Sequence, residues 1–108
     1  MNVIDTSLLT ERIRDGKPID EDVILISHIE YPMLFEYSGF HGKTIEPDLS
    51  DLKLAHELQK RLAARGRMKG AADLIIAATC IHLGATLFTR DHDFEDISKV
   101  SDLQVIIK

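Results

Sequence analysis

The residues best suited to chemistry are carboxylates that lie beside apolar segments of the chain. Asp73 opens a nearly continuous apolar run, and Asp91 and Asp93 follow a second, shorter apolar segment, 85–88. A stable hydrophobic core does not require acidic groups at such positions. When carboxylates converge, their pKa values rise or they share a hard divalent cation. These aspartates therefore indicate a site for metal chemistry.

Two further acids follow apolar segments in the first third of the chain. Asp5 comes directly after residues 2–4, and Glu30 falls shortly after 23–26, an uninterrupted apolar run typical of a buried parallel strand. The carboxyl ends of parallel strands meet at one edge of a sheet, and ligands bind there. We therefore expect one acidic cluster at that edge. Its members are Asp5, Glu30, Asp73, Asp91 and Asp93.

The side chains of this cluster predict which ion it would bind. Its ligands are oxygen atoms only, and the five histidines are scattered without metal-ligand spacing. Oxygen donors favour Mg²⁺ or Mn²⁺ over zinc. His92 stays open as a participant because it lies between Asp91 and Asp93. One such ion, or a pair, can lower the pKa of bound water and clamp a phosphodiester during in-line attack.

Strands and helices that alternate along the chain are expected to position the acids. Asp73 opens a segment that is apolar on nearly every face, the pattern of a buried helix, and Gly84 ends it. Either residue of Thr6-Ser7 can cap the first helix, and Ser50 can cap a later amphipathic helix. The predicted strands are 2–4, 23–26, 85–88 and 105–107, and the predicted helices are 8–14, 33–37, 51–65, 73–83 and 93–97. This alternation predicts a parallel sheet covered by helices on both faces.

Length and composition limit the classes of protein. With 108 residues, 44% hydrophobic and 29% charged, the chain is expected to form one soluble domain, 1–108. No apolar run approaches the ~20 residues of a membrane span. Asp5 interrupts the start of the chain, which argues against a secretory signal. The single cysteine, Cys80, is expected to be an inert core thiol. These features predict a cytoplasmic protein without a membrane contact.

Basic residues gather just before Asp73, although the net charge is −5. Cations suit the C-terminus of a helix, and this explanation is favoured for Lys60 and Arg61. Arg67 and Lys69 lie next to the expected acid site, where they are weak candidates for contacts with a phosphate backbone. Arg90, inside the second acidic segment, is a third weak candidate.

Together these motifs resemble the PIN-domain family, most closely the VapC-type ribonuclease toxins. The resemblance rests on Asp5-Thr6-Ser7 after the first strand, a glutamate after the second, D-x-x-I-A-A from Asp73, and T-x-D-x-D-F from Thr89. It implies a three-layer α/β/α sandwich with a central parallel sheet of four or five strands. It also implies a metal-dependent endoribonuclease, usually dimeric and inhibited by a small antitoxin.

The resemblance also assigns roles to individual residues. Asp5, Glu30, Asp73 and Asp91 would be catalytic, metal-binding acids, and Asp93 an additional metal ligand. Thr6 and Thr89 would orient these acids through their hydroxyl groups. Glu36 is an alternative to Glu30, but positions six apart on a helix face different directions, and Glu30 is nearer the strand end.

Other functions remain open alternatives. A phosphate-accepting receiver domain would need a pair of acids after the first strand, whereas Asp5 stands alone. A non-catalytic interaction module would not need every acidic position filled. A housekeeping RNA-processing nuclease cannot be separated from a toxin by sequence alone, and neither the RNA target nor the antitoxin can be read from it. A neighbouring reading frame encoding a small DNA-binding protein would favour the toxin.

A homodimer is expected from the aromatic segment after Glu30. It carries more large apolar side chains than one short helix can bury in so small a domain, and exposed apolar patches commonly mark interfaces. The residues are Tyr31, Met33, Phe35, Tyr37 and Phe40.

Overall fold

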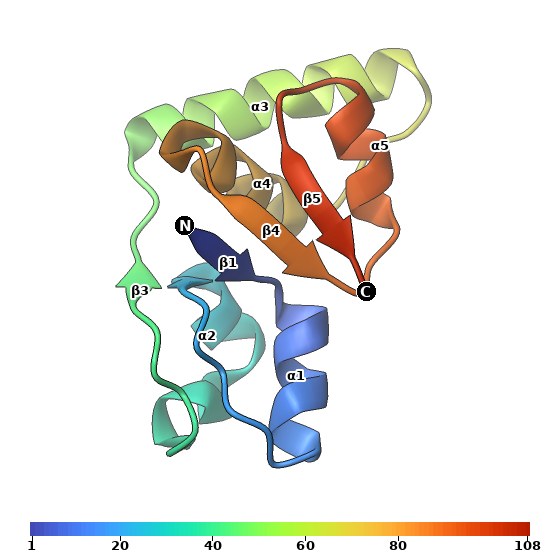
Figure 1. Ribbon diagram of the computed structural model, residues 1–108. Helices are drawn as coiled ribbons and strands as arrows, with labels where there is room; N and C mark the ends of the chain where they lie inside the picture. The colour runs from blue at the N-terminus through green and yellow to red at the C-terminus, as the bar shows by residue number, and fades with distance from the viewer.

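Five short parallel strands form the centre of the computed structural model, which describes all 108 residues (Figure 1). β1, β4 and β5 pair directly, and β2 pairs with β3. A bridge between Val3 and Asp22 joins the two groups, with the N–H of Ile4 donating to the carbonyl of Asp22 at 2.9 Å. The strand order is therefore β3-β2-β1-β4-β5. The strands are β1 (Asn2–Ile4), β2 (Val23–Ile24), β3 (Thr44–Ile45), β4 (Thr86–Thr89) and β5 (Gln104–Ile107).

Helices cover both faces of this sheet, as the alternating side chains of the strands require. Val3 and Leu87 point into a larger core formed with α3, α4 and α5. Their neighbours Ile4 and Phe88 pack on a smaller core formed with α1 and η1. The predicted α/β/α sandwich is confirmed. The helices are α1 (Thr6–Arg14), α2 (Ile26–Glu30), the 3₁₀ helix η1 (Pro32–Glu36), α3 (Leu49–Ala64), α4 (Ala71–Leu83) and α5 (Asp93–Lys99).

The predicted strand 23–26 is wrong in its second half. Leu25 already has helical dihedral angles, and α2 begins at Ile26. The N–H of Leu25 makes the last ladder bond, to the carbonyl of Ile45 at 2.8 Å. A short apolar run suits a buried strand or a buried helix equally well, so periodicity could not locate the change.

Helix termini differ from the predicted caps in three places. Asp5, and not Thr6 or Ser7, caps α1, because β1 leads into the helix without an intervening loop. Asp48 rather than Ser50 caps α3 in a reciprocal capping box with Asp51. α4 begins at Ala71, two residues before the predicted start. The predicted end of α4 at Gly84 is confirmed, with φ at +64°.

Two further parts complete the fold: the connector between η1 and α3, and the last helix, α5. The expected connector carries the short edge strand β3 at Thr44–Ile45, and the predicted turn at 93–97 extends to Lys99 as α5. The expected helix 33–37 is the 3₁₀ helix η1, with Pro32 in its first turn as expected. None of the helices combines the length and the apolar character needed to cross a membrane.

Candidate metal centre

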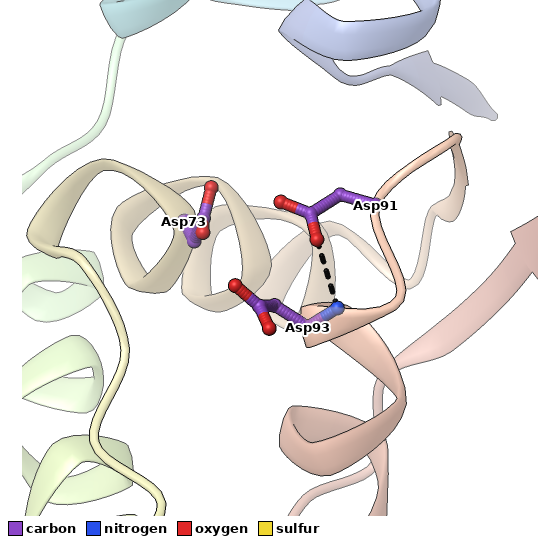
Figure 2. A group of neighbouring side chains, drawn as sticks. All are labelled: Asp73, Asp91 and Asp93. Atoms are coloured by element: carbon purple, nitrogen blue, oxygen red, sulfur yellow. Dashed lines mark hydrogen bonds between the residues drawn. The ribbon is translucent and has the colours of Figure 1, made fainter.

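Three carboxylates from separate elements meet beside the end of β4. Asp73 lies in the first turn of α4, Asp91 in the loop after β4, and Asp93 at the start of α5. One oxygen from each lies within 4.8 Å of the others (Figure 2). The N–H of Asp93 donates to Oδ1 of Asp91 at 2.9 Å, which fixes the loop that joins them. Asp73, Asp91 and Asp93 are called the acid trio below.

Asp5 is buried where β1 meets α1 and is held by three donors. Its Oδ2 accepts hydrogen bonds from the hydroxyls of Ser7 and Thr89, both at 2.8 Å, and from the N–H of Ser7 at 3.4 Å. Its Oδ1 accepts no hydrogen bond from the protein. One oxygen therefore anchors the side chain, while the other keeps its lone pairs for a cation.

Thr89 links Asp5 to the acid trio. Its fully buried hydroxyl donates to Asp5 and accepts from the N–H of Asp91 at 2.9 Å. Ser7 supports the same arrangement, because its Oγ also accepts from the N–H of Arg90 at 3.2 Å. The sequence drew attention to Ser7 as a possible helix cap and as part of the Asp5-Thr6-Ser7 motif, without assigning it a contact. Its role in holding Asp5 against the loop after β4 depends on contacts that local sequence does not reveal.

Glu30 is the last residue of α2, and Thr6 contacts it from the first turn of α1. The hydroxyl of Thr6 donates to Oε1 of Glu30 at 2.7 Å and lies 2.9 Å from the hydroxyl of Ser27. Glu30 is among the charges that raise the pKa of Asp73, whereas Glu36 is not. Thr6 therefore holds the carboxylate that faces the other acids.

Asp73 carries the electrostatic signature of the cluster. Burial is the largest cause of its raised pKa, followed by repulsion from Asp5, Asp91, Glu30 and Asp93, and together they bring the value to about 7. A carboxyl group at this pKa is partly protonated near neutral pH. Burial and the four neighbouring acids therefore both favour the protonated form of Asp73.

The donor set of the acid trio fits a hard divalent cation. Opposite oxygen ligands of one Mg²⁺ lie about 4 Å apart because each bond is about 2 Å long. The oxygens of the trio lie within 4.8 Å of one another, slightly wider than this spacing. Asp5 and Glu30 lie outside the trio but face it closely enough to repel Asp73. Nitrogen and sulfur donors are absent from the group.

The side chains that would have pointed to a softer metal are engaged elsewhere. His92 is exposed, and its Nδ1 lies 3.0 Å from Oε1 of Glu95, away from the acid trio. Cys80 lies in the core, where burial raises the pKa of its thiol to about 12. Neither side chain therefore contributes a nitrogen or sulfur ligand at the acid trio.

Two of the three basic residues expected to contact RNA are held in ion pairs. Lys69 Nζ lies 2.7 Å from Asp96 and 3.3 Å from Asp93, and its side chain is only 10% exposed. Arg90 forms a two-pronged ion pair with Glu11, both bonds at 2.7 Å. Arg67 is exposed and makes no ion pair.

Several solved structures share this fold at low sequence identity, and one of them is described as a member of the VapBC family of toxin–antitoxin systems. VapBC-5 from Mycobacterium tuberculosis is 19% identical, with a TM-score of 0.78 over 99% of this chain and 98% of that one. VapBC2 from Rickettsia felis, bound to a promoter DNA fragment, is 16% identical with the same score and the same coverage. FitAcB from Neisseria gonorrhoeae is 21% identical, with a TM-score of 0.74 over 98% and 96%. Comparison with curated proteins finds no match.

The family model described as "PIN domain" matches residues 41–100, more than half of the chain. The matched region contains the whole acid trio, while Asp5 and Glu30 precede it. The structural similarity extends over the N-terminal part as well, since the alignments cover 98–99% of the chain. The expected resemblance is confirmed by both comparisons: the chain belongs to the PIN-domain family.

Proposed function

We propose that this protein is a metal-dependent endoribonuclease of the cytoplasm and the toxin of a type II toxin–antitoxin pair. The observation that carries the proposal is the convergence of four other acids on Asp73, whose pKa is raised by burial and by these charges to about 7. Such crowding of like charges destabilises the protein when no cation is bound. Groups with strongly perturbed pKa values therefore cluster at functional sites. Family membership supports a nuclease, and the similar VapBC structures support a toxin.

The acid trio would hold a Mg²⁺ or Mn²⁺ ion, with Asp5 and Glu30 placed to complete its surroundings. When bound, such an ion supplies an activated water and neutralises the charge that develops on the phosphodiester. The protein contributes the fixed positions of the acids. Thr89 fixes Asp5 relative to Asp91, and Thr6 fixes Glu30. Hydrogen bonds of this kind orient the ligands of a metal and tune its affinity.

The proposed partners are RNA as the substrate, a small antitoxin protein and a second copy of this chain. The antitoxin is supported by the similar structures, which are described as toxin–antitoxin systems. The dimer is supported by Met33 and Phe35, which are 54% and 70% exposed, and by Ile29 beside them at 76%. Tyr31, Tyr37 and Phe40 pack against the smaller core instead, so the proposed interface is narrower than the sequence suggests.

Cleavage of single-stranded RNA by the purified protein tests the nuclease. We expect cleavage with Mg²⁺ or Mn²⁺ and none in excess EDTA, because the only ligand group is an all-oxygen one. Equal cleavage in EDTA would contradict the proposal. Growth arrest on expression, relieved by the small protein of the neighbouring reading frame, would separate a toxin from a housekeeping nuclease. A protein that binds RNA but never cuts it would favour the non-catalytic module.

Sedimentation equilibrium tests the dimer. A homodimer is expected at micromolar concentration, because Ile29, Met33 and Phe35 form an uncovered apolar surface. A monomer at high micromolar concentration would remove this part of the proposal and leave the nuclease intact.

A further inference from the structure

A basic hollow lies where the C-terminal ends of α3 and α5 approach each other. Its volume is about 160 Å³, and its floor is the buried side chain of Leu62. Three of its five lining residues are cationic and exposed, and one is acidic. The charged residues of this basic hollow are Arg65, Arg67, Lys99 and Asp96.

The backbone that presents the two arginines is held in place at the end of α3. Gly66 has φ at +69°, a conformation that favours glycine. The N–H of Gly66 donates to the carbonyl of Ala63 at 3.0 Å, and the N–H of Arg67 donates to that of Leu62 at 2.9 Å. This is the bonding pattern of a Schellman cap. Arg65 and Arg67 therefore stand on either side of a fixed turn.

The hollow carries unbalanced positive charge, in contrast to the protein as a whole. Arg65, Arg67 and Lys99 make no ion pair in the structure. Asp96, the one acid of the hollow, is already paired with Lys69, whose ammonium lowers the pKa of that carboxyl, with smaller contributions from Arg67 and Lys99. None of the three cations therefore has an anion within ion-pair distance, although Asp96 attracts Arg67 and Lys99 from farther away.

The basic hollow adjoins the acid trio through one side chain. The Lys69 ammonium bridges Asp96, which lines the hollow, and Asp93, which belongs to the trio. The side chain of Gln59 holds Lys69 by its backbone, accepting from its N–H at 3.0 Å and donating to its carbonyl at 2.6 Å. The hollow and the acid trio are therefore close enough for one RNA strand to contact both.

We infer that the basic hollow binds a phosphate of single-stranded RNA next to the phosphodiester that is cut, an inference that rests on the proposed nuclease function. Arginine fits phosphate because its planar guanidinium donates two parallel hydrogen bonds. Lys99 adds a third charge from α5. Lys69, which the sequence favoured for this role, instead pairs with Asp96 of the hollow and Asp93 of the trio and so lies between the two sites.

RNA binding without metal tests the hollow separately from cleavage. The probe is a fluorescein-labelled 12-nucleotide single-stranded RNA in EDTA, titrated at several KCl concentrations. We expect Arg65→Gln, Arg67→Gln and Lys99→Gln each to weaken binding by about threefold to tenfold at low salt. Each should also reduce the slope of log affinity against log salt by about 0.7, the value for one lost phosphate contact to a single strand. With Mg²⁺, KM should rise while kcat stays near the wild-type value.

Lys53→Gln is the matched control. Lys53 is exposed and unpaired, and it lies on α3 about three turns from the hollow. The substitution therefore removes the same charge at the other end of the same helix. Hollow variants that bind RNA no more weakly than this control would overturn the inference. A lowered melting temperature with unchanged RNA binding would also overturn the inference. The three cations would then serve to stabilise the C-terminal ends of α3 and α5, where the helix dipoles are negative.

Three further outcomes separate the proposed phosphate site from its alternatives. If the variants lose affinity for a polyglutamate peptide but not for RNA, the hollow is a docking site for acidic protein segments and the inference fails. If the wild type cuts RNA with Mg²⁺ and the variants bind RNA normally, the phosphate site at the hollow is refuted and the nuclease function stands. If the wild type never cuts RNA but the variants lose binding as expected, the nuclease is refuted and the phosphate site stands.

Discussion

Two aspartates occupy the same position in two helices of this protein and have opposite surroundings. Asp51 and Asp73 are each the third residue of a helix, α3 and α4 respectively. Asp51 is 5% exposed, accepts from the N–H of Asp48 at 2.9 Å and pairs with Nδ1 of His82. Asp73 accepts no hydrogen bond from the protein and is repelled by four other acids.

The contrast shows that the position of an acid in a helix does not decide its role. The neighbours that the fold brings to it do. Both aspartates gain equally from the positive end of a helix dipole. Asp51 has a hydrogen-bond partner, because α4 brings His82 to it, and the contact ties the start of α3 to the end of α4. Asp73 is left with negative neighbours only. An acid that a fold buries without a partner is the better candidate for a ligand of a metal ion.

The largest effect that would test this comparison is the loss of RNA cleavage in Asp73→Asn. Loss of a metal ligand should remove several kcal/mol of transition-state stabilisation, which corresponds to at least about 10²-fold in rate. Mg²⁺ should raise the melting temperature of the wild type, because it binds the folded state only, and should no longer raise that of the variant. Cleavage at the wild-type rate by this variant would end the assignment of Asp73.

Asp51→Ala should produce the reverse pattern. It removes half of a capping box and leaves His82 without its partner, so the free energy of unfolding should fall by about 1–2 kcal/mol. Urea unfolding measures this change. The rate of RNA cleavage below the melting transition and the stabilisation by Mg²⁺ should stay at wild-type levels. A comparable loss of cleavage in both variants would mean that the two aspartates do not differ in role.

The smallest expected effect is the pH dependence of stability without metal. The pKa of Asp73 is raised from 3.8 in the unfolded chain to about 7 in the folded one, so the folded state binds the proton more tightly. Its contribution to stability is therefore present at acidic pH and is lost as the pH rises through about 7. Asp73→Asn in EDTA should accordingly melt higher than the wild type by a few degrees at pH 8, roughly 4–8 °C for each kcal/mol.

The difference between Asp73→Asn and the wild type should shrink as the pH falls from 8 towards 4, because the wild-type carboxyl is then protonated in the folded state, and it should be lost below about 3.8, where the unfolded chain is protonated as well. A control with Asp51→Asn should not melt higher than the wild type at pH 8, because the Asp51 carboxylate has partners in His82 and in the N–H of Asp48. A variant that is destabilised at pH 8 in EDTA would show that Asp73 stabilises the fold, as Asp51 does, and would contradict the comparison.

The sequence by itself determined the features that depend on neighbours along the chain. The apolar run after Asp73 and the glycine at 84 predicted a buried helix and its end, because apolar periodicity and glycine caps are local signals. Acids placed directly after apolar strands predicted a cluster at one sheet edge, because parallel strands bring their carboxyl ends together. The α/β/α layers follow from the same alternation of strands and helices.

Only the tertiary structure decided which partner each side chain meets. Thr89 donates to Asp5 across 84 residues, and Arg90 contacts Glu11 across 79, because β1 and β4 are neighbours in the sheet. Lys69 was expected to face RNA, but the approach of α5 to the start of α4 gives it two aspartates instead. The end of β2 at Ile24 depends likewise on the length of its neighbour β3. Such contacts depend on strand order and helix packing, which the local pattern of a single sequence does not encode.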